Sequence, residues 1–176
     1  SLSLDAKGRL AIPARYREAL AQTANGNLVL TAHPHGCLLL YPVPAWEPIR
    51  DQILKAPSFD PRSAALKRVL VGNAREEEMD SAGRLLIAPE LRGHAKLEKQ
   101  VWMVGMGSHF EIWSDEGWQR QNDAALAALE ADHDFLLKGD VFTKDFLEAF
   151  TELKSAEEIK VRTFVHPLEY DLYYSV

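Results

Sequence analysis

Two short stretches of the chain carry the residue types best suited to binding chemistry. The first is DAKGR, from Asp5 to Arg9, and the second is DSAGR, from Asp80 to Arg84. Each presents an arginine at a fixed distance from an aspartate and a glycine. An arginine side chain can donate two parallel hydrogen bonds to a phosphate group or to the edge of a guanine base. Both stretches are therefore candidates for binding an anionic partner such as nucleic acid.

The aspartate and the glycine of each stretch predict a tight turn. An Asp side chain at the first position can accept hydrogen bonds from the turn's own backbone, and Gly at the fourth position supplies positive φ without a steric penalty. We interpret Asp5 and Asp80 as residues that form the turn and orient the arginine, while Gly8 and Gly83 permit the bend. The alternative for an isolated motif of this kind is a solvated hairpin tip without a partner.

The two turns belong to a longer internal repeat. LDAKGRLAIPARYR at residues 4–17 aligns with MDSAGRLLIAPELR at residues 79–92, so that Arg17 matches Arg92. Self-similarity over this length indicates two copies of one structural unit. Each copy predicts a strand into the turn, a return strand that begins at the arginine, and a short helix that starts near the following proline.

Hydrophobic periodicity and turn signals predict further strands and helices in each copy. The predicted elements are helices over 13–22, 44–56, 61–72 and 89–95, strands over 27–32, 37–42, 76–79, 85–88, 101–106 and 110–113, and a helix opened by Ser114. Neither copy has enough strands for a closed core, so we expect the two copies to interlock into one barrel. The predicted organisation is a first half-domain at 1–47, a helical connector at 48–74, a second half-domain at 75–119 and a C-terminal helix with an acidic extension at 120–176.

The two DxxxR turns, the segments RLAIP and RLLIAP that follow them, and LLLYPVPAWE at 38–47 together resemble the MraZ family of bacterial proteins. The resemblance covers about residues 1–130. It implies a β-rich α+β fold, a double-split β-barrel built from two tandem AbrB-like (SpoVT-AbrB) half-domains with pseudo-two-fold symmetry. It also implies a transcriptional regulator, with repression the expected sign. Such a regulator binds double-stranded DNA at short direct repeats upstream of a division and cell-wall gene cluster, and assembles into a ring-shaped homo-oligomer.

The DxxxR turn is the DNA-binding signature that this resemblance implies. Arg9 is the strongest candidate for a contact with a base edge or a phosphate. Lys7 and Arg15 are expected to contact phosphates, which position the protein without specifying a sequence. Arg17 adds to the same basic group around the first turn.

The second turn is less basic than the first. Arg84 is the equivalent of the first arginine, but Ala82 stands where the first copy has a lysine, and Glu90 where it has an arginine. We therefore expect the first copy to read DNA and the second to complete the fold or the ring interface. The alternative role for Arg84 is a structural ion pair with Asp80.

The charge balance does not argue against a nucleic-acid partner. The net charge is −6, but residues 1–128 carry 15 Lys+Arg and 15 Asp+Glu, whereas residues 129–176 carry 5 and 11. The whole excess of acid therefore lies in the C-terminal part, and a local basic face on a neutral body can still bind phosphate.

Composition also suggests where the protein works. The hydrophobic content of 47% and the single cysteine are those of an ordinary globular protein in a reducing compartment. No apolar run is long enough to span a bilayer and no signal peptide is recognisable, so the expectation is a cytoplasmic, nucleoid-associated protein with no membrane partner. Because the first residue is Ser, we expect that a few native residues precede it.

Residues 131–176 depart from the family pattern. Thr143 and Ser155 occupy positions typical of helix N-caps, and SAEE at 155–158 fits a capping box. The segment is open to three interpretations: a docking arm, an added subdomain, or sequence foreign to the native protein.

Other constellations are weaker candidates for function. His33, His35 and Cys37 alternate along HPHGC and are zinc-ligand types, but a hairpin connection explains them better, and we expect no metal. The four tryptophans could stack bases, although packing in the core or between subunits is the preferred interpretation. GMG at 105–107 lacks the third glycine of a dinucleotide fingerprint, and no Walker, nucleophile-elbow or zincin motif is present. We therefore predict no cofactor, no small-molecule substrate and no enzymatic activity.

Two other functions remain open at this point. One is an AbrB-like antitoxin, in which the same barrel binds DNA and the acidic C-terminal part binds a toxin. The other is an oligomeric scaffold that does not bind DNA, or an enzyme.

Overall fold

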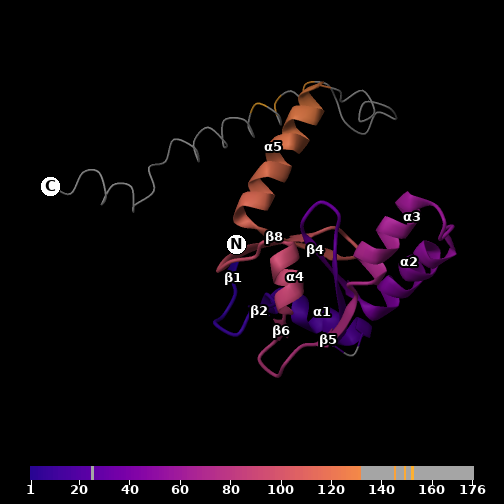
Figure 1. Cartoon of the computed structure of the whole chain (residues 1–176). Helices are drawn as coiled ribbons and strands as arrows, with labels where there is room; N and C mark the ends of the chain where they lie inside the picture. Colours follow the sequence, from indigo (N-terminus) through magenta and orange to yellow (C-terminus); the bar gives the residue numbers. More distant parts are fainter. Residues whose placement is uncertain (25, 132–144, 146–148, 150–151, 153–176) are drawn as a thin grey trace. The chain divides into compact units, whose positions relative to one another are not determined.

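The computed structural model describes residues 1–24, 26–131, 145, 149 and 152. The chain divides into two units, Ser1–Gln119 and Arg120–Val176. The N-caps predicted at Thr143 and Ser155 lie outside the described residues. The fold that positions the repeated turns is that of the first unit (Figure 1).

The first copy of the repeat forms a series of short strands with two helices. Its elements are β1 (Leu2–Ser3), β2 (Arg9–Ala11), α1 (Ala14–Ala24), β3 (Asn27–Ala32), β4 (Leu38–Pro42) and α2 (Val43–Lys55). The return strand begins at Arg9 as predicted, and a tight turn over HPHG joins β3 to β4, with the His33 N–H donating to the Cys37 carbonyl over 2.9 Å.

The connector between the copies contains a helix that changes its winding. The helix predicted over 61–72 is α3 (Pro61–Leu66) followed directly by η1 (Lys67–Val71), a π-helical turn. Asp60 caps α3 as a helix N-cap does, because its carboxylate accepts from the Ser63 N–H over 2.7 Å. The Asn73 amide donates to the Arg68 and Val69 carbonyls, which provides partners where the regular helical pattern ends.

The second copy follows the same order of elements. Its elements are β5 (Arg75–Glu78), β6 (Arg84–Leu86), α4 (Pro89–His94), β7 (Gln100–Gly105), β8 (Phe110–Ser114) and α5 (Asp115–Ala131). The return strand begins at Arg84, as predicted. Ser114 caps α5 by accepting from the Gly117 N–H over 3.1 Å.

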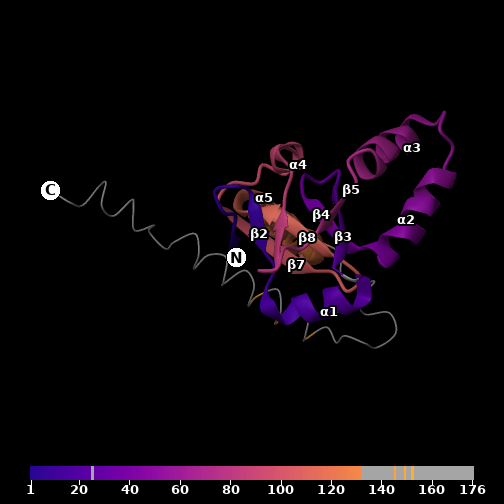
Figure 2. The same cartoon turned by 90° about the horizontal axis from the view of Figure 1, so that it is seen from below.

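The strands of the two copies are shared between two antiparallel sheets. The larger sheet has the strand order β1-β7-β8-β4-β3-β5, and the smaller sheet pairs β2 with β6. Strand β1 of the first copy pairs with β7 of the second, and β5 of the second copy pairs with β3 of the first. The expected interlocking of the copies is confirmed, and the result is a strand-rich α+β unit whose large sheet is curled into a half-barrel (Figure 2).

The predicted hairpins are present only at their tips. In the first copy Leu4 and Leu10 form one isolated bridge, and the Asp5 N–H donates to the Arg9 carbonyl over 3.0 Å. Beyond the tip the two strands separate, because β1 is hydrogen-bonded to β7 while β2 is hydrogen-bonded to β6. The main partner of each return strand is therefore the return strand of the other copy.

Alternation along β2 and β6 decides which side chains reach the surface. Leu10 and Leu85 are register partners, and both are fully buried in the main core. Because successive side chains of a strand point to opposite faces, Arg9 and Arg84 face outward. Each arginine is only half-buried, in contrast to the leucine that follows it. Burial of the leucines thus fixes the direction of the arginines.

A second cluster of buried side chains is aromatic. It brings together Trp46 and Trp113 with Tyr41, Leu39 and Cys37, between β4, β8 and α2. The indole N–H of Trp113 donates to the Glu111 carboxylate over 2.9 Å. Core packing therefore accounts for these two tryptophans.

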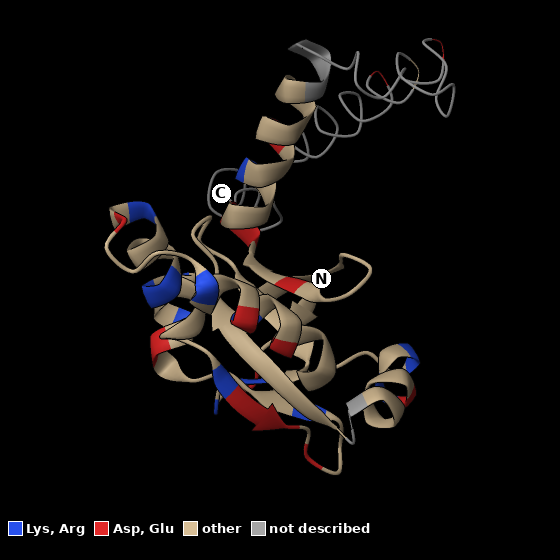
Figure 3. Cartoon of the chain, turned by 90° about the vertical axis from the view of Figure 1, so that its right-hand side faces the viewer, with Lys and Arg blue, Asp and Glu red and all other residues tan. Residues whose placement is uncertain are grey.

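Charge is balanced within the first unit. Residues 1–119 contain 14 Lys+Arg and 14 Asp+Glu. Acidic and basic residues are distributed among its helices and strands (Figure 3). Within the part of the chain that the structure describes, no helix combines the length and the apolar character needed to cross a membrane.

The β2–β6 pairing predicts a sharp contrast between two neighbouring leucines. Leu85→Ala should lower the free energy of unfolding by about 2–5 kcal/mol, because it leaves a cavity opposite Leu10. Leu86→Ala, in the same strand at a side chain that is 46% exposed, should change it by less than about 1 kcal/mol. Denaturant unfolding at one protein concentration measures both variants. Equal losses would contradict the assigned alternation.

Candidate nucleic-acid interface

The two DxxGR turns lie at opposite ends of one short antiparallel ribbon. In the β2–β6 register Arg9 is opposite Leu86, and Arg84 is opposite Ala11. The ribbon continues into both turns through backbone hydrogen bonds between the copies. The Ile12 N–H donates to the Gly83 carbonyl over 2.9 Å, and the Ile87 N–H donates to the Gly8 carbonyl over 3.0 Å. Each turn is therefore anchored by the other copy.

In the first turn one carboxylate organises both backbone and side chain. Asp5 Oδ1 accepts from the backbone N–H groups of Lys7 and Arg9, both over 2.9 Å. Asp5 Oδ2 accepts from Arg9 Nε over 2.7 Å, and Arg9 Nη2 lies 2.7 Å from the same oxygen. Gly8 has φ +79°, a conformation that glycine adopts without strain. The aspartate thus fixes the turn and aims the arginine at the same time.

The second turn repeats this geometry. Asp80 Oδ1 accepts from the backbone N–H groups of Ala82 over 3.0 Å and Arg84 over 2.9 Å. Asp80 Oδ2 lies 2.8 Å from both Arg84 Nε and Arg84 Nη2. Gly83 has φ +71°. The second turn therefore has the same hydrogen-bonded geometry as the first, although it carries fewer basic residues.

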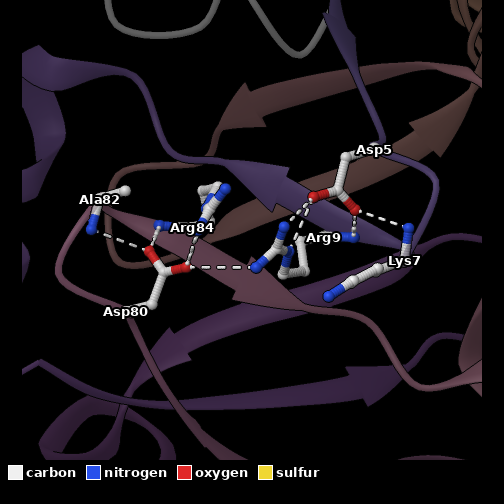
Figure 4. A network of polar contacts seen from close by, with 6 residues as sticks. All are labelled: Asp5, Lys7, Arg9, Asp80, Ala82 and Arg84. Carbon is white, nitrogen blue, oxygen red and sulfur yellow. Dashed lines mark hydrogen bonds and ion pairs between the residues drawn. The ribbon is translucent and has the colours of Figure 1, made fainter.

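A cross-contact joins the two turns into one network. Arg9 Nη1 lies 3.8 Å from Asp80 Oδ2, so the first arginine faces carboxylates of both copies, whereas the only ion pair found for Arg84 among the described residues is with Asp80 (Figure 4). The side chain of Arg9 is 27% exposed and that of Arg84 is 37% exposed. Both arginine side chains therefore retain solvent-exposed surface beside the carboxylates that orient them.

Hydrogen bonding lowers the pKa of both aspartates, so their carboxylates stay charged to lower pH than an ordinary aspartate. The pKa of Asp5 is lowered to about 2, chiefly by the hydrogen bond from the Arg9 backbone N–H, with further contributions from the Arg9 side chain and the Lys7 backbone N–H. The pKa of Asp80 is lowered for the same kind of reason, with the Arg84 backbone N–H as the largest cause. A charged carboxylate is the form that accepts these bonds most strongly.

The other basic residues predicted around the first turn fall into two groups. Lys7 and Arg15 are exposed, and the Arg15 guanidinium lies 4.6 Å from the centre of the Tyr16 ring. Arg17 is instead half-buried, and its Nε donates to the Ile12 carbonyl over 2.6 Å. The structure therefore brings Arg17 to the ribbon itself.

Arg92 is a residue of this site that the sequence reasoning left out. Its guanidinium packs against Gly8, and Arg17 packs against Gly83 in the same way. The signal was present in the repeat alignment, where Arg17 and Arg92 occupy equivalent positions, but a position shared by two copies does not reveal which turn it touches.

The HPHGC segment does not assemble a metal site. The described residues contain no group of three or more His, Cys, Asp or Glu side chains arranged to hold a metal ion. His33 and His35 contact each other edge to face, and the His33 carbonyl lies 2.8 Å from His94 Nε2. Burial raises the pKa of the Cys37 thiol to about 12, which makes it a poor nucleophile.

Fold and site together define a class of protein: a strand-rich α+β unit of two interlocked tandem copies that presents two aspartate-oriented arginines on one ribbon. The chain belongs to the MraZ family, because the model of that family, described as "MraZ protein, putative antitoxin-like", matches residues 1–69 and again residues 70–137. The resemblance inferred from the motifs is thereby confirmed.

Several relatives are highly similar over most of their length. The chain is 72% identical over 132 residues to a protein of Dechloromonas aromatica, covering 75% of this chain and 89% of the relative. It is 65% identical over 127 residues to a protein of Aromatoleum aromaticum (72% and 86% covered), and 59% identical over 128 residues to one of Methylobacillus flagellatus (73% and 86% covered). Each of these proteins is named transcriptional regulator MraZ, and none of these names describes an enzyme.

The low pKa of Asp5 predicts an acid-sensitive turn. Above 3.8, the ordinary value, this carboxylate is charged in folded and unfolded chains alike, and its contribution to stability is fully present. As pH falls from 3.8 towards about 2, the unfolded chain takes up the proton first, so the contribution is lost. NMR titration of the Asp5 carboxyl carbon measures this pKa.

Two variants separate the causes of that shift. Arg9→Ala should raise the pKa of Asp5 only part of the way, because the backbone N–H that is the largest single cause of the lowering remains. Arg84→Ala, in the other turn, should leave it unchanged. A full return to 3.8 in Arg9→Ala would show that the side chain, and not the backbone, controls the carboxylate.

Proposed function

We propose that the protein is a transcriptional regulator that binds double-stranded DNA through the β2–β6 ribbon, with Arg9 and Arg84 as the central contacts. The observation that carries this proposal is the adjacency of two outward-facing arginines, each held by an aspartate of its own turn and joined by the Arg9–Asp80 contact. Pre-oriented side chains lose little conformational freedom on binding, which favours affinity. The names of the relatives support the regulatory role.

The charges around the ribbon support an anionic partner. Two carboxylates, Asp5 and Asp80, are accompanied by five basic side chains at or against the turns: Lys7, Arg9, Arg17, Arg84 and Arg92. The local balance is 5 − 2, or +3, within a unit that is neutral as a whole. Such a local excess attracts phosphate, and its contribution should weaken as salt is added.

The two arginines are not equivalent in this proposal. Arg9 is shared between two carboxylates and is the less exposed of the pair, whereas Arg84 faces one carboxylate and is more exposed. Bound DNA would take the outward N–H donors of both, and Lys7 and Arg15 would contact phosphates beside the first turn. The second turn thus belongs to the DNA-binding surface, although its own sequence is less basic.

The finer architecture is also part of the proposal. Exchanging equivalent strands of the two copies turns the order β1-β7-β8-β4-β3-β5 into its own reverse, which supports a double-split barrel with pseudo-two-fold symmetry. We further propose half-domains at 1–47 and 75–119, a connector at 48–74 and a C-terminal part from 120.

We also propose that the protomers assemble into a ring. The ring would place successive ribbons on successive direct repeats upstream of a division and cell-wall gene cluster, and the protein would act there as a repressor associated with the nucleoid.

Two observations favour the antitoxin alternative. The family description includes the term antitoxin-like, and residues 129–176 carry 11 acidic against 5 basic residues. A basic toxin would suit that segment. Co-purification of a toxin encoded beside this protein's gene, lost when residues 132–176 are removed, would favour the antitoxin over a regulator that acts without a toxin.

Fluorescence anisotropy tests the DNA-binding proposal directly. The duplex is taken from the region upstream of the protein's own gene, and a scrambled duplex of the same composition is the comparison. The native duplex should bind more tightly, with affinity falling steeply as salt rises. Arg9→Ala should lower affinity for the native duplex by about tenfold or more, consistent with the ~1–3 kcal/mol of a good bidentate contact, and should reduce the preference.

The matched control removes the same charge elsewhere. Arg62→Ala alters an exposed arginine on α3, outside both turns, and should leave the preference for the native duplex intact. Absence of binding to either duplex by the unmodified protein would overturn the proposal.

Recognition of repeats by neighbouring protomers makes a separate prediction. Linked contacts add their free energies only when the sites can be engaged together. Inserting five base pairs between two repeats turns the second site to the opposite side of the duplex and should weaken binding by about a hundredfold, whereas inserting about ten base pairs should restore part of it. Affinity that does not depend on spacing would exclude this mode of assembly on DNA.

A further inference from the structure

We propose that Arg17 and Arg92 are positioning residues, each of which holds the DNA-binding turn of the opposite copy. Arg17 of the first copy supports the turn that ends in Arg84, and Arg92 of the second copy supports the turn that ends in Arg9. The consequence for DNA rests on the proposed function, whereas the crossed support itself concerns the protein alone. For Arg17 this role takes the place of the direct DNA contact expected from the sequence.

Arg17 reaches the second turn from α1. A Cβ atom added at Gly83 would lie 2.5 Å from Arg17 Cδ and 2.8 Å from Arg17 Cζ, so the side chain rests directly on the glycine backbone. Arg17 Nε also donates to the Ile12 carbonyl over 2.6 Å, and the Ile12 N–H donates to the Gly83 carbonyl over 2.9 Å. Arg17 therefore contacts the turn directly and also through one residue of the ribbon, Ile12.

Arg92 reaches the first turn from α4. A Cβ atom added at Gly8 would lie 2.7 Å from Arg92 Cζ, 2.8 Å from its Nε and 3.0 Å from its Nη1. The Ile87 N–H donates to the Gly8 carbonyl over 3.0 Å, as the Ile12 N–H does to the Gly83 carbonyl. One detail differs: Arg92 Nε is buried and has no hydrogen-bond partner among the described residues.

The contact of Arg92 with Gly8 is one of packing, because its buried Nε has no hydrogen-bond partner among the described residues. Leaving a buried donor unsatisfied typically costs about 1–3 kcal/mol. The flat guanidinium can lie against a glycine at close range, and a compact lysine ammonium cannot reproduce that contact. Each of the two glycines thus meets two requirements. It adopts a positive φ, and its lack of a Cβ atom lets an arginine of the other copy pack against the turn.

The position of each glycine gives these contacts a functional consequence. Gly8 directly precedes Arg9, and Gly83 directly precedes Arg84. A side chain that rests on the glycine limits the movement of the peptide from which the DNA-contacting arginine starts. Loss of Arg92 should therefore loosen the first turn and loss of Arg17 the second, which is the reverse of what proximity along the chain suggests.

Hydrogen–deuterium exchange of the full chain without DNA tests this crossed pattern. Arg92→Ala should speed exchange of the amides at residues 7–9 by about fivefold or more, the effect of losing about 1 kcal/mol of local stability, and leave residues 82–84 unchanged. Arg17→Ala should do the opposite. Arg15→Ala, which removes an exposed charge from the same helix as Arg17, should alter neither turn.

Lysine variants keep the test decisive if an alanine variant does not fold. Arg17→Lys and Arg92→Lys retain the charge and most of the aliphatic stem but not the flat group, so they should give the same crossed pattern. Faster exchange in both turns of every variant would show a general structural role and overturn the proposal. Unchanged exchange, or a change confined to the turn of the same copy, would also overturn it.

DNA-binding affinity provides a second, independent test of the Arg17 and Arg92 variants. A positioning residue should lower the ratio of native to scrambled affinity by about tenfold while the salt dependence on the scrambled duplex stays the same. A salt slope reduced by about 1 with normal exchange would instead make Arg17 a phosphate contact and overturn its positioning role. If the unmodified protein binds neither duplex, the proposed function fails, and the exchange pattern still decides whether the crossed support exists.

Discussion

The structure depends on one short backbone ladder, the pairing of β2 with β6. These strands are only three residues long, yet each belongs to a different copy, so every hydrogen bond between them also joins the copies. Their inward side chains, Leu10 and Leu85, bind the ribbon to the core. The outward positions are then left to the two arginines. Without this pairing the turns would have no fixed relation to each other.

The aspartates of the ribbon orient the two arginines, but they also partly neutralise the charge that would attract a phosphate. A guanidinium held by a carboxylate is well placed but partly neutralised, and exposed ion pairs of this kind add little to stability. Here Oδ1 of each aspartate accepts from two backbone N–H groups of its own turn, and a backbone hydrogen bond is the largest cause of the lowered pKa of Asp5 and Asp80. The carboxylates would therefore remain in place when a stronger anion draws the arginines outward. A phosphate would then bind N–H donors of the two arginines that are already oriented for it.

The sequence allowed the parts of this site to be predicted more completely than their assembly. Asp-x-x-Gly specifies its own turn, and a hydrophobic residue after each arginine specifies which way the arginine points, so both turns and the starts of β2 and β6 could be read locally. The pairing partners could not, since a three-residue strand carries no signal that distinguishes its neighbour in the chain from the other copy. For the same reason Arg92 was overlooked: its role is defined by Gly8, which lies 84 residues away in sequence (92 − 8). The π-helical turn at Lys67–Val71 likewise has a partner far away in sequence, since the Thr31 hydroxyl donates to the Leu70 carbonyl.

Strand exchange between the copies also bears on how such a chain could have arisen. A single copy would leave β1 without β7, β2 without β6 and β3 without β5. It could satisfy those edges only by associating with a second identical polypeptide. The tandem repeat is thus equivalent to a homodimer whose two subunits have been fused into one gene product. Unlike two identical subunits, the two halves of one chain can differ at equivalent positions, as Lys7 differs from Ala82 and Arg15 from Glu90.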